Sequence, residues 1–295
     1  MGDSEQPPVA RRKTATPEKG VAGELAQDRV VGGKDISTWY TPFGRRLAAL
    51  AERIGAWVGP HATLVLTLLV GMAAVVVLAA AAAEVYDAVT EADGVAGLDE
   101  PMLHAAIGIR SPWLNVAATA FTDVGGAIMM PIIAIGVMVA LALRRRSWTP
   151  VILILAAGIG SLLMTIVGKR LIGRTRPSLA DAVPPFEHSP SFPSGHTLNA
   201  VVIAGIIAYL LVLRRHHQWS RISIIAVALG FALTIAATRV YLGHHWFTDV
   251  LAAFCLGLAW LALVITAHRL YLTVRKSYRQ RRTGDPDPVP AVDGV

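Results

Sequence analysis

Residues 148–177 read WTPVILILAAGIGSLLMTIVGKRLIGRTRP, and this stretch decides the fold. Its first part, Trp148–Gly168, contains no charged residue. A helix that crosses a bilayer needs about 20 predominantly apolar residues, so the run predicts a transmembrane helix. The polar cluster that begins at Lys169 and ends at Arg176-Pro177 follows directly, which places it where the chain leaves the membrane.

Five more apolar runs of similar length surround this one. They cover His61–Ala83, Gly125–Leu143, Thr197–Leu213, Ile222–Thr238 and Trp246–Ala267, the last interrupted only by Asp249. The composition agrees, because only 16% of the residues are charged, whereas soluble domains carry about 25%. A soluble protein with buried helices would not contain six such runs. We therefore expect an all-α, polytopic membrane protein with a bundle of six transmembrane helices.

The distribution of charge predicts the orientation of this bundle. With six spans, 21 Lys and Arg residues lie on the side that holds both termini, and six lie on the other side. The positive-inside rule then predicts a multi-pass protein of the cell membrane with cytoplasmic termini. The net charge of +7 reflects this asymmetry, so it implies no nucleic-acid partner. No apolar signal-peptide core occurs near the start, and we expect the first span to direct insertion.

Outside the spans, composition divides the chain into four parts. Residues 1–40 are polar and contain several prolines, which predicts a disordered cytoplasmic tail. Residues 41–58 place apolar side chains at helical spacing opposite arginines, as in an amphipathic helix at a membrane surface. An extension of the first span, bent at Gly59-Pro60, explains that pattern equally well. The six-helix domain is expected over 59–272, and a basic, flexible cytoplasmic tail over 273–295.

Three polar clusters stand at the ends of these runs. They are Lys169 with Arg176-Pro177, then Pro193-Ser194-Gly195-His196, and then Thr238-Arg239 followed by His245 and Asp249. In a six-span topology, the third and fifth spans run outward and the fourth and sixth begin on the outside. All three clusters therefore meet at one depth on the extracytoplasmic side, which predicts a site at the membrane boundary.

The three clusters resemble the signature of the type 2 phosphatidic acid phosphatase superfamily, which also holds the vanadium haloperoxidases and bacterial class A acid phosphatases. That signature reads Lys-x6-Arg-Pro, Pro-Ser-Gly-His and Ser-Arg-x5-His-x3-Asp. The match spans residues 169 to 249, and Thr238 alone departs from it, standing where the family usually has Ser. Threonine keeps the hydroxyl, so only fine positioning at residue 238 is in doubt.

The chemistry of these residues suits a phosphoryl group, whose spread negative charge requires fixed positive donors. Arg176 and Arg239 offer planar forks that can bind phosphate through two hydrogen bonds, and Lys169 offers a point charge. Ser194 and Gly195 stand where a helix begins and free backbone N–H groups attract an anion. Arg170 and Arg174 are not assigned by the family motif, and we interpret them as interfacial residues whose charged ends reach water.

Two histidines remain for the chemistry. Asp249 lies four residues after His245 and five after the adjacent His244, so His245 shares its helix face. The spacing of the family motif from Arg239 also selects His245. We assign His245 as the nucleophile that forms a phosphohistidine, Asp249 as the residue that orients it, and His196 as the general acid. His244 is left with a supporting or structural role.

The resemblance implies a membrane lipid phosphatase that hydrolyses a lipid phosphate or diphosphate. Polyprenyl diphosphate is the favoured substrate, because an outward-facing site is where spent carrier lipid appears, and phosphatidate or phosphatidylglycerol phosphate comes next. We expect no cofactor, since the sequence holds no metal-ligand spacing, and no obligate protein partner beyond the lipid substrate and the bilayer. The alternative is a non-catalytic member of the fold that binds or transports lipids.

Overall fold

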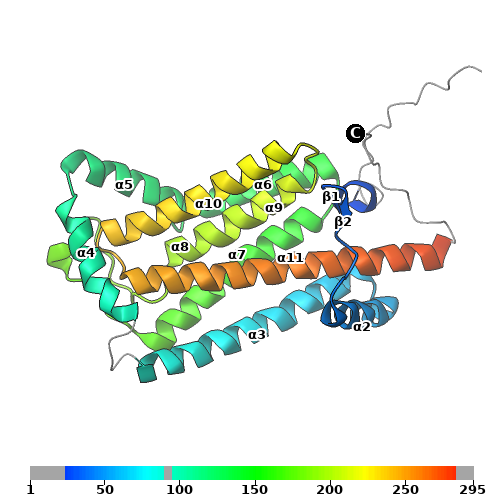
Figure 1. The fold of residues 1–295 in the computed structure, drawn as a ribbon, viewed down its shortest axis with the longest axis horizontal. Coiled ribbons are helices and arrows are strands. Elements are labelled where there is room, and N and C mark those ends of the chain that lie inside the picture. The colour runs from blue at the N-terminus through cyan, green and yellow to red at the C-terminus, as the bar shows by residue number, and fades with distance from the viewer. Residues whose placement is uncertain (1–23, 90–94, 284–295) are drawn as a thin grey trace, which may run out of the picture.

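A computed structural model describes residues 24–89 and 95–283 (Figure 1), and it is an all-α bundle whose long helices run side by side. The α8, η4 and α9 segments form one continuous helix over 195–212. The elements that make up the long helices are α3 (Pro60–Val89), α6 (Met129–Arg145), α7 (Thr149–Ile172), α8 (Gly195–Asn199), η4 (Ala200–Ala204), α9 (Gly205–Val212), α10 (Gln218–Tyr241) and α11 (Phe247–Thr283).

Among the described residues, four helices are long and apolar enough to cross a membrane. They cover Thr149–Ile172, Gly195–Val212, Gln218–Tyr241 and Phe247–Arg281. A fifth is added if α5 (Pro112–Val124) and α6 count as one span, although they bend by 45° at their junction. The first expected span lies on α3, where Pro60–Ala73 forms a shorter apolar helix. The all-α fold is confirmed, whereas the expected count of six is not.

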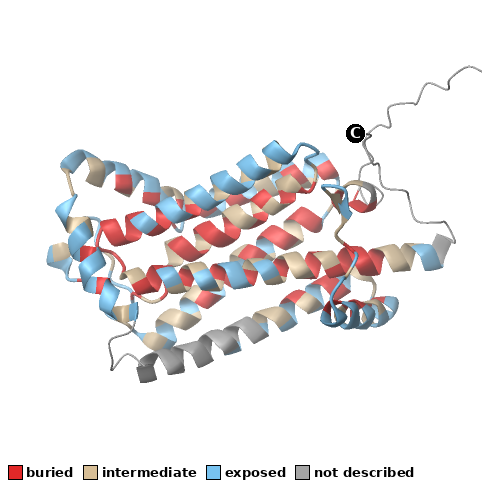
Figure 2. Ribbon diagram, in the orientation of Figure 1, coloured by how far each residue is buried: buried red, intermediate tan, exposed pale blue. Residues whose placement is uncertain are grey.

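The core lies along the faces on which these helices meet (Figure 2). Leu153 of α7, Leu198 of α8, Ile206 of α9 and Trp260 of α11 are almost fully buried there. The outer faces are also apolar, as Val227, with 72% of its surface exposed, illustrates. Large exposed apolar surfaces mark contact with another molecule or with a membrane, and here they encircle the bundle as lipid contact requires.

Short elements cover one end of the bundle, on the left in Figure 1. After α3 they are η2 (Val95–Leu98), α4 (Asp99–Gly108) and α5, with η3 (Leu179–Asp181) in the loop that follows α7. Proline occupies the first turn of α5, where its fixed φ favours a helix start. These elements surround the three polar clusters.

The opposite end carries an N-terminal segment that is folded. It contains η1 (Glu24–Asp28) and a hairpin of β1 (Val30–Val31) and β2 (Lys34–Asp35), whose turn uses Gly32 and Gly33 at positive φ. We predicted a disordered tail over 1–40, of which 1–23 lie outside the described residues and 24–40 differ from the prediction. The reason is charge pairing, since buried Asp28 accepts hydrogen bonds from Arg145 and Arg214 of the bundle.

The α2 helix (Pro42–Val58) lies beside this segment and is separated from α3 by Gly59, whose φ is +84°. It buries small residues such as Ala48 and Ala51 against α11 and exposes Phe43 and Trp57. The α11 helix continues to Thr283, and Val274 and Arg275 are buried in it. The boundary expected at residue 273 therefore falls inside a helix.

Candidate active site

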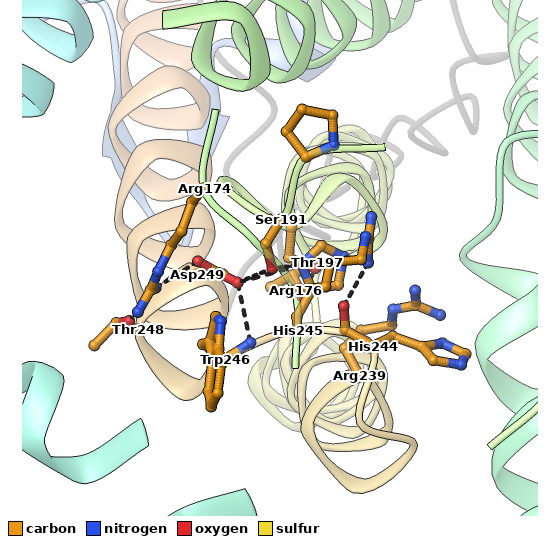
Figure 3. A network of polar contacts seen from close by, with 12 residues as sticks. Arg174, Arg176, Ser191, Thr197, Arg239, His244, His245, Trp246, Thr248 and Asp249 are labelled. Atoms are coloured by element: carbon orange, nitrogen blue, oxygen red, sulfur yellow. Dashed lines mark hydrogen bonds and ion pairs between the residues drawn. The ribbon is translucent and has the colours of Figure 1, made fainter. Parts of the chain in front are cut away.

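The three polar clusters meet at the end of the bundle that α4 and α5 cover, and Figure 3 shows Arg176 of the first cluster close to His245 and Asp249 of the third. The first cluster begins in the last turn of α7, which Gly173 terminates in the left-handed conformation. The second opens α8, and Gly168 of α7 approaches so closely that a Cβ there would lie 2.5 Å from Pro193. The third spans the turn from α10 to α11.

A tight turn positions the two adjacent histidines of the third cluster. Gly243 has a φ of +70°, and a Cβ at this position would lie 2.4 Å from the carbonyl oxygen of Asp181. The backbone N–H groups of His244 and His245 both donate to the carbonyl of Arg239, at 3.1 and 3.2 Å. The turn therefore requires glycine and presents the two imidazoles in different directions.

His244 points to the loop that follows η3, because its Nε2 lies 2.7 Å from the carbonyl oxygen of Val183. His245 instead faces Asp249, with 3.5 Å between Nδ1 and Oδ2. Asp249 is fully buried, and its Oδ2 also accepts hydrogen bonds from the Ser191 hydroxyl and the Trp246 N–H. The carboxylate is thus held in place by Ser191 and Trp246 before it meets the imidazole.

The other nitrogen of His245 faces the first cluster. Its Nε2 lies 3.2 Å from a guanidinium nitrogen of Arg176. A guanidinium can only donate, so Nε2 offers its lone pair and the proton resides on Nδ1, toward Asp249. Burial, followed by the positive charges of Arg239 and Arg176, lowers the pKa of His245 well below its usual value. His245 is therefore neutral, and its Nε2 lone pair accepts from Arg176.

The two arginines of the signature share one carboxylate. Glu187 lies 2.8 Å from Nη2 of Arg176 and forms a second ion pair with Arg239. Arg239 is 1% exposed and Glu187 is 30% exposed. Burial alone would raise the pKa of Glu187, but Arg239 and Arg176 outweigh it and lower the value to about 2. The two arginines therefore form an anion-binding cluster, which we call the anion pocket, and Glu187 is its anion.

His196 borders the same pocket from the first turn of α8. Its ring is close enough to Arg239 and Glu187 for both of their charges to act on it. The junction of α5 and α6 lies against it, since a Cβ on Gly126 would come within 3.4 Å of His196 Nε2. The structure thus brings both predicted catalytic histidines and both signature arginines to one pocket.

The remaining predicted residues hold the walls of this pocket. Lys169 donates to the Ser189 hydroxyl at 3.1 Å and to the carbonyl of Pro190, and so fastens the loop before α8. Ser194 is buried, its hydroxyl lies 3.0 Å from that of Thr197, and its N–H donates to the carbonyl of Asp249. Gly195 packs near Thr165 of α7. In this state, neither Lys169 nor the Ser194 hydroxyl points freely into the pocket.

Arg174 differs from its interpretation as an interfacial residue. Its guanidinium lies 2.7 Å from Asp249 and 2.6 Å from Asp99, the first residue of α4. Asp99 in turn accepts hydrogen bonds from the N–H and hydroxyl of Thr248. Arg174 therefore joins α4 and α11 behind the catalytic pair, and its side chain is 19% exposed rather than extended into water.

Sequence reasoning also missed Glu187, Ser191 and Asp99. Glu187 and Ser191 belong to the proline-rich loop that precedes the second cluster, so an acidic and a hydroxyl residue in that loop were an available signal. Asp99 offers no such signal, because 149 residues separate it from its partner Thr248.

The chain is similar to known proteins in sequence and in fold. Residues 148–271 match the PAP2 superfamily. Phosphatidylglycerophosphatase B of Bacillus subtilis (strain 168) is 37% identical over 178 residues, which cover 58% of this chain and 84% of that protein. The crystal structure of a transmembrane PAP2 type phosphatidylglycerolphosphate phosphatase from Bacillus subtilis aligns with a TM-score of 0.55 at 31% identity, over 69% of this chain and 93% of that one.

Proposed function

This chain belongs to the PAP2 superfamily, and on that premise we propose that it is a membrane phosphatase that removes a terminal phosphate from a lipid, with His245 as its nucleophile. The family that the three motifs resembled is thereby confirmed. One observation carries the mechanism. The unprotonated Nε2 of His245 faces the anion pocket, where it accepts from Arg176 and would turn to phosphorus when substrate binds, and Asp249 lies next to Nδ1.

The proposed reaction has two steps. In the first, His245 Nε2 attacks phosphorus, a nitrogen–phosphorus bond forms, and the bond to the lipid oxygen breaks. His196 gives its proton to that departing oxygen. In the second, water attacks the phosphohistidine and loses a proton to His196, which releases inorganic phosphate and restores the neutral imidazole of His245 and the protonated imidazolium of His196. Asp249 stabilises the positive charge that develops on His245 during attack.

Fixed positive charge stabilises the transition state in this proposal. Arg176 and Arg239 already hold an anion between them, and the three equatorial oxygens of a transferring phosphoryl group would replace its carboxylate. Lys169 shapes the pocket wall through Ser189 and Pro190. These side chains supply the charge stabilisation that a metal ion supplies elsewhere, so we propose metal-independent turnover.

The placement in the membrane is also part of the proposal. The apolar runs give the six spans of this proposal, and the charge asymmetry between the two ends gives its cytoplasmic termini and extracytoplasmic pocket. Residues 24–58 and the end of α11 lie at the end of the bundle opposite the pocket (Figure 1), as this topology requires. A pocket at the membrane boundary suits a lipid whose phosphate is in water while its chains remain in the bilayer.

Two substrate classes fit this site. Polyprenyl diphosphate is the substrate that an outward-facing pocket favours, and phosphatidylglycerol phosphate is the one in the names of the relatives. Each carries a terminal phosphate on an apolar anchor, and the pocket would bind that terminal phosphate.

The test is phosphate release by the purified full-length protein in detergent from polyprenyl diphosphate, phosphatidate and phosphatidylglycerol phosphate. We expect turnover of at least one of them, retention of activity in EDTA, and inhibition by vanadate. A strict requirement for added magnesium would overturn the mechanism. Binding without any release of phosphate would favour the non-catalytic lipid-binding alternative.

A further inference from the structure

A side chain of the protein itself occupies the anion pocket. Glu187 pairs with Arg176 and Arg239, and its carboxylate is within electrostatic range of the rings of His245 and His196. It therefore stands among all four groups to which the proposed mechanism assigns the phosphoryl group. Sequence reasoning gave this residue no role.

The same two arginines would pair with the Glu187 carboxylate in one state of the protein and with the substrate phosphate in another. Arg239 is almost completely buried, so its charge requires an anion at close range in every state of the protein. Glu187 supplies that charge in the structure, and the substrate phosphate would supply it in the complex. Glu187 is 30% exposed, so its side chain can leave the arginines and have its charge solvated by water. The loop is anchored at the neighbouring residues Ser189 and Pro190, which hold to Lys169.

We propose that Glu187 is a competing carboxylate that a substrate phosphate must displace, and that this competition selects doubly charged terminal phosphates, of a monoester or a diphosphate, over singly charged phosphodiesters. This inference rests on the proposed function and specifies what its pocket accepts. A phosphodiester would replace the single negative charge of Glu187 with another single negative charge. Its binding to the two guanidinium groups would therefore gain little free energy. A monoester dianion brings an additional charge and an additional oxygen.

Such selection answers a problem that a membrane phosphatase faces. Its pocket would lie at the level of the headgroups, where phosphodiester lipids are abundant and would fill a vacant pair of arginines. A resident carboxylate excludes these lipids but still yields to the dianion. The same competition weakens the binding of the product phosphate, which favours its release.

The charges around Glu187 keep it ionised, so the pH dependence of the competition comes from the substrate and not from Glu187. The groups that interact with it are Lys169, Arg176, His196, Arg239, His244 and His245. Since the two arginines keep the pKa of Glu187 at about 2, it remains charged from pH 5 to 8. Phosphate monoesters gain their second charge near a pKa of about 6, so binding should follow that ionisation.

The test compares Glu187→Gln with the wild type in the full-length protein. Calorimetric titration with inorganic phosphate at pH 7.5 should show at least a tenfold tighter Kd in the variant. Adding phosphatidylglycerol, a singly charged phosphodiester, to a phosphatidate assay should inhibit the variant and leave the wild type active. Glu100→Gln is the matched control, because Glu100 is exposed on α4 at the same end of the bundle and its substitution removes the same charge. It should behave as the wild type.

Equal or weaker phosphate binding in Glu187→Gln would overturn the proposal, as would equal inhibition of both proteins by phosphatidylglycerol. If the variant does not fold, the wild type still decides the question. Sulfate, a dianion, should compete with vanadate for the pocket, whereas methyl sulfate, a monoanion of similar shape, should not. Equal competition by the two would exclude selection by charge.

Failure of the proposed function leaves a different result. Tighter phosphate binding by Glu187→Gln in a protein that hydrolyses no lipid would support the competing carboxylate and reject the phosphatase. Normal hydrolysis with unchanged phosphate binding in the variant would support the phosphatase and reject the competing carboxylate.

Discussion

The guanidinium of Arg174 lies 2.7 Å from the Asp249 carboxylate, on the oxygen that does not face His245. The two residues are 75 positions apart in the chain. Arg174 therefore holds one carboxylate oxygen of Asp249 while His245 contacts the other. This pairing makes Arg174 a positioning residue, one that acts on the proposed chemistry through Asp249 without contact to the phosphate.

Replacement of Arg174 by lysine should lower kcat about 10- to 100-fold, the range typical of residues that orient a catalytic group. Lysine keeps the charge but cannot bridge Asp249 and Asp99 with a planar fork. KM should stay nearly constant, since Arg174 does not enter the anion pocket. The measurement is kcat and KM determined separately. Arg170→Lys, an exposed position four residues earlier, is the control, and an equal loss in both variants would contradict this role.

The effects of replacing the two histidines should differ when the leaving group changes. His245→Ala should abolish turnover of every substrate, because no phosphohistidine can form. His196→Ala should cost about 10²- to 10⁴-fold with a lipid alcohol, which must be protonated as it leaves. With an activated aryl phosphate the loss should be much smaller. The measurement is kcat on both substrates, and a tolerated His245→Ala alongside an inactive His244→Ala would show that the nucleophile was assigned to the wrong residue.

Gly126 should be intolerant of even a methyl group. A Cβ there would lie 2.9 Å from the carbonyl of Asp123 and 3.4 Å from His196 Nε2, where the proposed proton transfer takes place. We expect Gly126→Ala to reduce kcat at least tenfold, equivalent to about 1.4 kcal/mol of barrier. Gly136→Ala is the matched control in α6, because a Cβ at Gly136 would meet nothing within 4 Å. Unchanged activity in Gly126→Ala would show that His196 has more room than the structure indicates.

Labelling with a membrane-impermeant thiol reagent in intact cells should establish the orientation. The native Cys255 is exposed and is first replaced by serine. A cysteine at His188, in the loop that carries Glu187, should then react, and one at Gln218, the first residue of α10, should react only after lysis. The reverse pattern would place the pocket on the cytoplasmic side and change the list of available lipids.

The sequence by itself determined the helical membrane bundle and the identity of the signature residues. Apolar runs such as Trp148–Gly168 are local properties, because the bilayer thickness sets their length and each helix satisfies its own backbone hydrogen bonds. The i,i+4 relation of His245 and Asp249 is equally local, since one helix face carries both side chains. Predictions of this kind depend on spacing along the chain and need no knowledge of the fold.

Only the tertiary structure decided how the polar groups pair. Arg174 and Glu187 carry no periodic signal, and their partners come from segments that the chain brings together after long separations. The folding of residues 24–40 has the same origin, since Asp28 is buried only because Arg145 and Arg214 meet it at the end of the bundle. A buried charge is tolerated where an opposite charge is within reach, and the fold alone brings those charges together.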